Sequence, residues 1–472
     1  MVLFSGGSIY KMASEMAITS QLDLTSFKAM GAAKSRRVTV NPENFSGTLS
    51  STASTQDIYF TLPSGKYSFI NGQNSYICFE ARARWTSTTA TAAVIGCCNA
   101  SASSFFRSME VQLQSQSVEL IDKYNVFAAL VEDFQPIGRS GTIMNILAGG
   151  ANAADGAVAN TVKQSDILGI PAANAPFTGA IAAAAAATTS NYYRFAVPLY
   201  SSVLGTLQQQ YMPAADGIRL RLTIESSEVP IVFAGPTFTA SSMAYDIQRM
   251  SLQMDYLDVA PEVHSQLVAE AGGVLRQHGS AVANFGTTFS SGTQQSLLIP
   301  ARFSSLKNYF TVFRRSDNTT LAAGNCPGGR VNPYLIDYVY RIDGRNYPSV
   351  NVVVGSGTSA AGYKPLCGEA FMELCKCFHA LHSAQFDCVF DGGNYCDSTG
   401  TARTSAFAIG IDMEQDQGGK TVISGMDTNS SNTYLDLNCA DVPVAAISVD
   451  TFAIYDLIIE YDASSGALSY SK

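Results

Sequence analysis

The chain has 472 residues, a formal net charge of −9 and a sequence pI near 5, with 46% apolar and 14% charged residues. This length is sufficient for two or three domains with buried cores. The acidic balance argues against a surface that wraps nucleic acid, because phosphate binding needs concentrated Lys and Arg. With so few charged residues, much of the surface must be neutral and polar or buried against other subunits.

From the sequence we expect neither a signal peptide nor a membrane-spanning segment. The N-terminal residues lack the run of about seven or more apolar residues of a signal peptide, and no run of about 18 apolar residues exists. The ten cysteines include no CxxC pair, and Cys97 and Cys98 are adjacent, which is poor geometry for two disulfides. We therefore expect a soluble protein from a reducing compartment with mostly free, buried thiols.

Three basic residues, Lys34, Arg36 and Arg37, lie close together near the N-terminus. They could form a local basic lining, but a solvated arm is the simpler interpretation of short charged segments near a terminus. We predict an N-terminal arm at residues 1–35.

The first half of the chain reads as β-structure with one helix. Ile218, Leu220 and Leu222 alternate with polar residues, which is typical of a half-buried antiparallel strand. The strands predicted from such patterns lie at residues 108–114, 195–205, 218–225 and 249–258. A helical pattern covers residues 122–134. Long Ala- and Gly-rich segments follow at 146–166 and 179–191; the Ala run in the second fits a short helix or an ordered surface loop.

Strand alternation stops near residues 259–280, where Gly272 and Gly273 also appear. Adjacent glycines interrupt regular structure, so we place a linker at residues 263–280. It separates a first domain at 36–262 from a second at 281–472.

The second half repeats the pattern order of the first. Its strands are predicted at residues 309–313, 337–349, 406–414, 432–438 and 449–462. Asp343-Gly344 provides a hairpin turn, and residues 368–383 form the second helix. Each half runs strand pair, helix, loop, strand, strand and final strand. This order predicts a mainly β protein with two tandem eight-stranded antiparallel jelly rolls, short helices and long loops.

A metal site could be formed by Cys375, Cys377, His379 and His382. On a helix Cys375, His379 and His382 would share one face, and Cys with His suits zinc. Cys377 would point elsewhere, and supporting carboxylates are not evident. Packing of a helix against the sheets explains these residues better.

The remaining catalytic patterns are weak. QGGKTVIS (residues 417–424) lacks the first glycine of a phosphate-binding loop, so its Gly pair is better explained as a hairpin turn. No GxSxG motif is present, and His264 and His278 stand in no nucleophile motif. A cupin metal site would need paired His and Glu on strands, whereas these histidines are expected on helix or linker.

The final strand, VDTFAIYDLIIEYD, places Asp450, Asp456, Glu460 and Asp462 within 13 residues. Asp456 and Glu460 are about 13 Å apart along a strand, too far to share a metal or a proton. A glycosidase would take its second carboxylate from another strand. The end of the first half carries Asp255 and Asp258 at the corresponding place, which favours an architectural role.

The residue pattern of this strand also predicts which of its side chains are buried. Ala453, Tyr455, Leu457, Ile459 and Tyr461 alternate and should enter the core. The acids should lie on the opposite face, which we expect to be the side of the strand toward water. Phe452, Ile454 and Ile458 share that face and should be covered by a loop or another subunit.

Seven stretches together resemble the double jelly-roll major capsid proteins of polinton-like viruses and their Polinton and virophage relatives. They lie at residues 103–130, 195–205, 295–317, 336–349, 369–381, 424–438 and 449–462. Each is short, and their order and spacing carry the resemblance. It implies two jelly rolls standing upright on a capsid, three chains in a pseudo-hexagonal capsomer, and no catalytic site.

We therefore expect a viral major capsid protein that forms homotrimers and an icosahedral shell in the virion. It would be no enzyme and would need no cofactor or metal. Its partners would be itself, penton proteins and minor capsid proteins, without specific nucleic-acid binding; contact with an internal membrane is left open. The alternatives are a carbohydrate-binding or host-attachment jelly roll, weakened by the single tryptophan, Trp85, and a glycosidase using Glu460 or Asp462.

Overall fold

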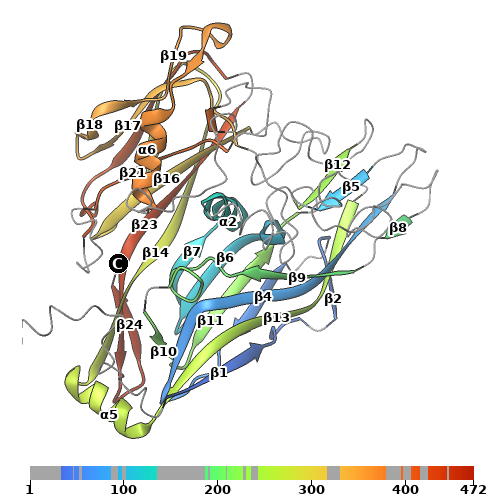
Figure 1. Cartoon of the computed structure of the whole chain (residues 1–472), viewed down its shortest axis with the longest axis vertical. Helices are drawn as coiled ribbons and strands as arrows, with labels where there is room; N and C mark the ends of the chain where they lie inside the picture. The colour runs from blue at the N-terminus through green and yellow to red at the C-terminus, as the bar shows by residue number, and fades with distance from the viewer. Residues whose placement is uncertain are drawn as a thin grey trace, which may run out of the picture.

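The structure of the chain is a computed structural model, and it describes residues 33–45, 47–52, 56–86, 94–97, 102–134, 187–189, 192–208, 210–226, 230–234, 243–315, 330–378, 395–396, 406–414, 424–443 and 446–471. The predicted mainly β architecture is confirmed (Figure 1). The loop at 146–166 and most of 179–191 lie outside the described residues. Within the second segment, residues 187–189 form a short strand.

Residues 33–259 form the first unit, which contains two sheets. One sheet has the order β1-β13-β4-β10, with β9 and β8 also on β4 and β2 on β13. Its strands are β1 (Ala33–Val40), β2 (Thr48–Ser50), β4 (Ser68–Thr86), β8 (Ala187–Thr189), β9 (Tyr193–Pro198), β10 (Met212–Pro213) and β13 (Met243–Val259). The facing strands have the order β7-β6-β11-β3. They are β3 (Asp57–Thr61), β6 (Phe106–Leu113), β7 (Gln116–Ile121) and β11 (Ile218–Ile224). A separate pair is β5 (Val94–Cys97) with β12 (Ile231–Ala234).

Residues 274–471 form the second unit with the same strand order. One set runs β14-β23-β16-β21, with β24 on β23, and the other runs β15-β22-β17-β18. The strands are β14 (Val274–Phe289), β15 (Gln294–Ile299), β16 (Leu306–Arg315), β17 (Leu335–Ile342), β18 (Arg345–Val353), β21 (Ala408–Asp412), β22 (Thr433–Cys439), β23 (Ile447–Asp462) and β24 (Leu468–Ser471). The short strands β19 (Gly355–Ser356) and β20 (Lys364–Pro365) form a pair of their own.

The internal repeat predicted from pattern order is confirmed by this topology. In each unit the first strand pairs with the final strand: β1 with β13, and β14 with β23. In each unit a helix also follows the strand at one end of the second set, which is β7 in the first unit and β18 in the second. These helices are α2 (Tyr124–Asp133) and α6 (Gly368–Cys377). The two helices predicted from the sequence are therefore present, although the described part of α6 ends at Cys377.

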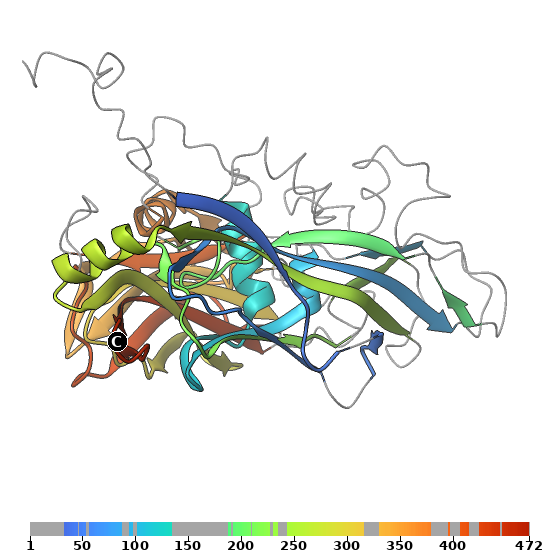
Figure 2. The ribbon, with the colours of Figure 1, turned by 90° about the horizontal axis from the view of Figure 1, so that it is seen from below.

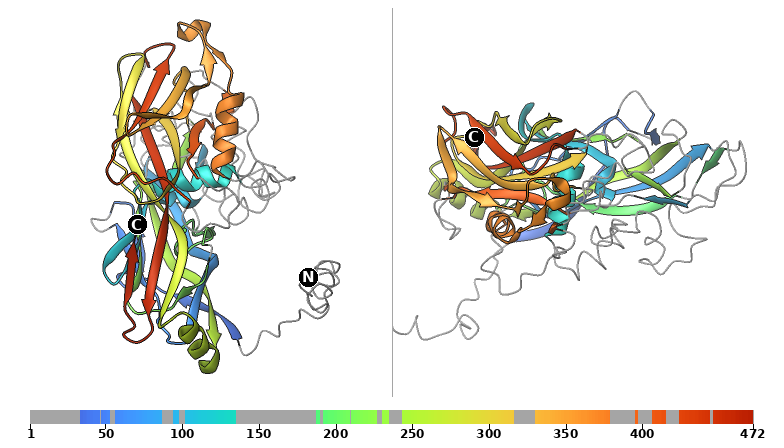
Figure 3. Two further views of the ribbon diagram at one scale, coloured as in Figure 1. Left: turned by 90° about the vertical axis from the view of Figure 1, so that its left-hand side faces the viewer. Right: turned by 90° about the horizontal axis from the view of Figure 1, so that it is seen from above.

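One nine-stranded sheet passes through both units. Its order is β21-β16-β23-β14-β7-β6-β11-β3, with β24 attached to β23. The units join where β14 lies parallel to β7, through the pair Ala283 and Leu120. Figure 1 and the left view of Figure 3 show the long β14 and β23 strands running down beside the first unit, and Figure 2 gives the view from below. The second unit is thus connected to the first by sheet contact as well as by the chain.

The segment predicted as a linker, residues 263–280, is more regular than the sequence suggested. Residues 263–270 belong to helix α5 (Pro261–Glu270), and strand β14 begins at Val274. Proline suits the first turn of a helix, where its missing N–H has no partner to lose. Gly272 and Gly273 follow with φ of +69° and +92°, a conformation that ends the helix at little cost for glycine. Helix α5 was not predicted, and the linker extends less far than expected.

The predicted hairpin is present between β17 and β18. Asp343 and Gly344 have φ of +50° and +73°, as a tight two-residue turn requires. The other predicted strands are also present, with bounds that differ by a few residues, except that the strand predicted at 195–205 ends as β9 at Pro198. Strand β13 is longer than predicted and begins at Met243.

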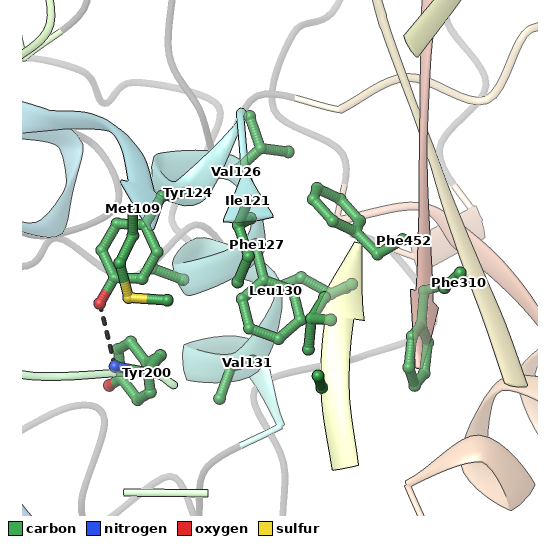
Figure 4. Packing of buried hydrophobic residues seen from close by; sticks show 14 of the residues in the cluster. Met109, Ile121, Tyr124, Val126, Phe127, Leu130, Val131, Tyr200, Phe310 and Phe452 are labelled. Carbon is green, nitrogen blue, oxygen red and sulfur yellow. Dashed lines mark hydrogen bonds between the residues drawn. The ribbon is translucent and has the colours of Figure 1, made fainter. Parts of the chain in front are cut away.

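The buried core extends from one unit to the other through helix α2. All ten residues of α2 are buried. Figure 4 shows Phe127 of α2 facing Phe452 of β23, with ring centroids 5.4 Å apart. On its other side Tyr124 accepts a hydrogen bond at its hydroxyl from the backbone N–H of Tyr200, 2.9 Å away. A helix that is buried all round needs protein on every side, and here both units supply it.

Candidate functional site

The apolar face predicted for the final strand is confirmed, because its five members are all at most 8% exposed. The prediction for the opposite face is wrong for two acids. Asp450 and Asp456 are 1% and 6% exposed and do not face water. Strand β23 lies between β14 and β16 in the nine-stranded sheet, and residues on both of its faces are buried along much of its length. Phe452 is fully buried, whereas Ile454 and Ile458 are half-buried.

The two buried acids are held by basic side chains from β16. Arg314 donates from Nε and Nη2 to one oxygen of Asp450, at 3.1 and 2.7 Å. Lys307 lies 3.3 Å from Asp456 and 3.0 Å from Glu414. Burial disfavours the Lys307 ammonium, but its contacts with Glu414 and Asp456 outweigh this effect and raise the pKa of Lys307. These contacts join neighbouring strands and account for both acids structurally.

The two acids at the end of the strand have separate partners. Glu460 accepts a 2.8 Å hydrogen bond from Arg276 of β14. Asp462 accepts hydrogen bonds from Ser464 and Ser465 in the following turn, which lower the pKa of Asp462 to about 2. Glu460 and Asp462 therefore bind different partners and do not form a carboxylate pair of the kind that a glycosidase uses.

Only half of the Cys/His candidate site lies in the described residues. Cys375 and Cys377 are buried in α6, whereas His379 and His382 lie outside. The Cys377 thiol contacts the carbonyl of Glu373, and burial raises the pKa of Cys377. A thiol must lose its proton to bind zinc, so this environment fits packing better. Among the described residues no group of three or more His, Cys, Asp or Glu could hold a metal ion.

The described cysteines are free thiols, as the sequence predicted. They are Cys78, Cys367, Cys375, Cys377, Cys396 and Cys439. All of them except Cys396 are buried, and Cys396 is half-buried. Burial of uncharged thiols is ordinary core packing.

The histidines occupy places that the sequence only partly indicated. His264 lies in α5, where its ring packs edge-on against Tyr67 with centroids 5.3 Å apart. Burial lowers the pKa of His264. His278, expected in the linker, lies in strand β14 instead.

The remaining candidates are the Gly418-Gly419 pair, Trp85 and the basic cluster. Residues 415–423, which include the Gly418-Gly419 pair, lie outside the described residues, and the backbone of Trp85 belongs to β4. The basic cluster is no solvated arm, because Lys34, Arg36 and Arg37 belong to β1. Arg36 and Arg37 bind Asp258 and Asp255 of β13 at 2.8 and 3.1 Å. The sequence did not reveal this pairing, because the partners are over 200 residues apart in the chain.

A polar depression of about 390 Å³ lies on the β15-β22-β17-β18 sheet. Its lining residues are Gln294, Gln295, Ser296, Asp337, Asn351, Asp436, Leu437 and Asn438. Asp337 already accepts from Asn351 and Asn438, at 2.8 and 3.0 Å. No aromatic side chain lines the depression, so it lacks the exposed aromatic surface expected of a carbohydrate-binding protein.

The sequence did not reveal the hydrogen bonds that join the two units at β7. Three consecutive residues of β7 contact the second unit: Ser117 and Val118 accept through their carbonyls, and Glu119 through its side chain. Tyr470 donates to Ser117 at 3.2 Å and Tyr455 donates to Val118 at 3.0 Å. We call β7 and these partners the junction.

A second contact near the junction brings α2 against the second unit. Phe134 stacks on Phe378 with centroids 3.7 Å apart. Asp133, at the end of α2, binds the fully buried Arg330 guanidinium. Burial raises the pKa of Asp133 although Arg330 opposes that effect. Aromatic stacking of this kind adds about 1 kcal/mol beyond burial, so the two units are packed together as one body.

Two of the strands that end a sheet among the described residues bear on assembly. They are β1, at one end of β1-β13-β4, and β18, at one end of β15-β22-β17-β18. Strand β18 carries exposed Val350 and Val353, which are 74% and 41% exposed. Leu366 and Met372 nearby in the chain are about half exposed. Open strand edges with apolar side chains are sites for pairing with another chain.

No helix in the described part of the chain is long and apolar enough to cross a membrane. No family model matches the sequence, and no curated protein is significantly similar to it. Solved structures do resemble it.

Three of these resemblances span nearly the whole of both chains. The Faustovirus major capsid protein has a TM-score of 0.59 and 10% identity, covering 92% of this chain and 91% of its own. A chain of the Sputnik virophage has a TM-score of 0.59 and 10% identity, covering 96% and 92%. PBCV-1 VP54, fitted into a Sputnik reconstruction, has a TM-score of 0.52 and 10% identity, covering 93% and 97%. The chain therefore has the fold found in viral major capsid proteins, as the resemblance in its sequence implied.

Proposed function

We propose that the chain is a viral major capsid protein that builds an icosahedral shell. The observation that carries the proposal is the fold: both units together match capsid proteins over nearly the full length of each chain. A partial match would fit any β-sandwich, whereas two units in the same order and contact are a specific arrangement. The residues flagged as catalytic candidates support this role, since the described ones serve the packing of strands and helices.

Each unit is, in this proposal, one eight-stranded antiparallel jelly roll. The first would use β1, β13, β4 and β9 against β3, β11, β6 and β7. The second would use β14, β23, β16 and β21 against β15, β22, β17 and β18. Helix α2 lies in the connection from β7 to β9, and helix α6 lies in the connection from β18 to β21. These matching connections between the two sheets of each unit support a shared topology.

Three copies would close into a ring of six jelly rolls, and the junction suggests how. Strand β7 ends its set in the first unit and meets β14, the first strand of the second unit. Strand β18 has the place of β7 in the second unit, and β1 has the place of β14 in the first. We infer that β18 of one copy lies beside β1 of the next. Heterologous contacts of this kind generate closed rings when the rotation fits.

The shell would also contact penton and minor capsid proteins within the virion. An enzymatic role has no support in the described residues, and we propose none. A capsid subunit buries much of its surface in obligate contacts, commonly 2,000 Å² or more per interface. This fits a chain with only 14% charged residues.

The assembly is tested by measuring the mass of the purified chain in solution. Light scattering should give three times 50.1 kDa, and negative-stain images should show hexagonal particles. Val350→Glu should reduce the trimer to monomer, because a charge would be buried in the β18 contact. Leu298→Glu is the matched control: Leu298 is 49% exposed on β15, at the opposite edge of the same sheet.

Two outcomes would contradict the proposal. A strictly monomeric wild-type protein across salt and protein concentration would argue against a capsid subunit. A trimer that survives Val350→Glu but is lost in Leu298→Glu would place the contact at the other edge of the sheet and overturn the β18-β1 assignment alone.

A further inference from the structure

Glu119 is a fully buried carboxylate at the junction of the two units. It lies in β7, one residue before Leu120, which pairs with Ala283 of β14. Buried carboxylates are rare unless they are paired with a basic group. The mode of assembly proposed above does not explain why an acid occupies this position.

The Glu119 side chain joins three separate segments of the chain. Its carboxyl accepts from the backbone N–H of Ser202 at 3.1 Å and of Val282 at 3.3 Å. It also accepts from the Ser201 hydroxyl, which itself accepts from Val203 and Leu204. Glu119 therefore connects β7, the segment after β9, and β14 of the second unit.

No basic side chain forms an ion pair with Glu119 in the described part of the structure. The titratable groups facing it are Tyr124 of α2 and Tyr455 of β23. Burial raises the pKa of both phenols, so both are neutral at physiological pH. The segment after β9 and strand β14 contribute only Ser201 and backbone N–H groups. A charge on Glu119 is thus supported by dipoles alone.

We infer that Glu119 acts as a proton-controlled latch between the two units, which holds them more tightly as the pH falls below neutral. Opening the junction admits water to the carboxyl and favours its charged form. Closing it removes that water, so the closed junction binds the proton better than the open one. The latch does not depend on the proposed capsid function.

The pH range follows from the two states of the carboxyl. In the closed junction burial raises the pKa of Glu119 to about 7, although Ser201 and the two backbone N–H groups oppose the effect. An open, hydrated junction returns the pKa toward 4.5, the ordinary value. As the pH rises between these two values, the equilibrium constant for opening the junction should therefore increase by up to tenfold per pH unit, roughly 300-fold in all. Above the higher value it should level off.

Amide hydrogen exchange of the intact chain tests the latch directly. The peptides that contain Ser202 and Val282 should lose protection as the pH rises from 5 to 8, after correction for the intrinsic exchange rate. In Glu119→Gln, which keeps the shape but cannot ionise, their protection should not change with pH. Glu110→Gln is the matched control, since Glu110 is buried on neighbouring β6 but is paired with Arg221 at 2.8 Å.

A second variant keeps the test decisive if Glu119→Gln does not fold. Ser201→Ala removes a donor that favours the carboxylate, so it should move the change in protection to higher pH. Protection that is independent of pH in the wild type, or equally dependent in Glu119→Gln, would overturn the inference. So would a Ser201→Ala variant whose change in protection stays at the pH of the wild type.

Discussion

The final strands of the two units, β13 and β23, occupy the same place in the repeat but hold their acids differently. Asp255 and Asp258 of β13 bind Arg37 and Arg36 at the surface, where both arginine side chains are about half exposed. Asp450 of β23 is buried with Arg314, whose side chain is 16% exposed. Both pairs link neighbouring strands. Only the second does so away from water.

The two kinds of pair differ in their position along the strand, because Asp255 and Asp258 lie near the end of β13 and Asp450 lies near the start of β23. Strand β13 lies next to β1, which ends its sheet, so this region faces solvent. Strand β23 lies beside β14, which continues into the first unit through β7. An Asp–Arg pair is therefore a surface contact at the end of β13 and a buried contact near the start of β23, and β13 also has a buried acid, Asp246, paired with Arg82. Buried charges are strongly destabilising when one partner is removed, whereas exposed pairs contribute little.

The largest effect should come from a charge in the core of β23. Leu457→Asp or Ile459→Asp buries an unpaired carboxylate in a face that is 2% exposed at both positions. The cost should exceed about 4 kcal/mol, a large part of a domain's stability of about 5–15 kcal/mol. We expect no folded protein, measured by soluble yield and circular dichroism. A folded Leu457→Asp protein would show that this face is not core.

The next test compares the two ion pairs directly. Asp450→Ala should destabilise the chain by about 3–5 kcal/mol, because the Arg314 guanidinium is left without its carboxylate in a buried site. Asp258→Ala, in the exposed ion pair of β13, should cost at most about 1 kcal/mol. Urea unfolding of both variants measures the difference. Equal midpoints would mean that burial does not distinguish the two strands.

The smallest effect is expected at Asp462, in the turn after β23. Its lowered pKa means that its stabilising contribution is present above the ordinary value of 3.8 and is lost as the pH falls toward 2. Asp462→Asn should leave the oligomer unchanged and lower the pH 7 unfolding midpoint only slightly, because solvent screens this exposed side chain. The variant should also show a weaker loss of stability below pH 4 than the wild type. Loss of the oligomer at neutral pH would show that Asp462 makes a contact between copies.

Local patterns predicted the elements well because they depend on short-range sequence. The alternation in β11 and β23 and the Asp343-Gly344 turn each involve only a few neighbouring residues, and all are present. Helix α5 was missed because its exposed surface gives it only a weak apolar stripe: His264 is its single buried residue. A proline followed by adjacent glycines at the other end was the available signal.

Long-range partners could not be predicted in the same way. Asp456 was expected to face water because strand alternation assigns faces but does not reveal what covers them. Its partner Lys307 is 149 residues away, on a strand whose position depends on the whole unit. The junction is similar: nothing near Glu119 in the sequence indicates Ser201 or Val282. Pattern order predicted the repeat, but the contact between its two copies needed the structure.

The pairing of first and final strands has an evolutionary consequence. Ala33 lies opposite Val259 in the first unit, and Val274 lies opposite Asp462 in the second. The chain thus enters and leaves each unit at neighbouring points. A gene segment encoding such a unit can be duplicated in tandem with only a short connector, because no strand has to be rethreaded. Helix α5 and its two glycines are that connector here.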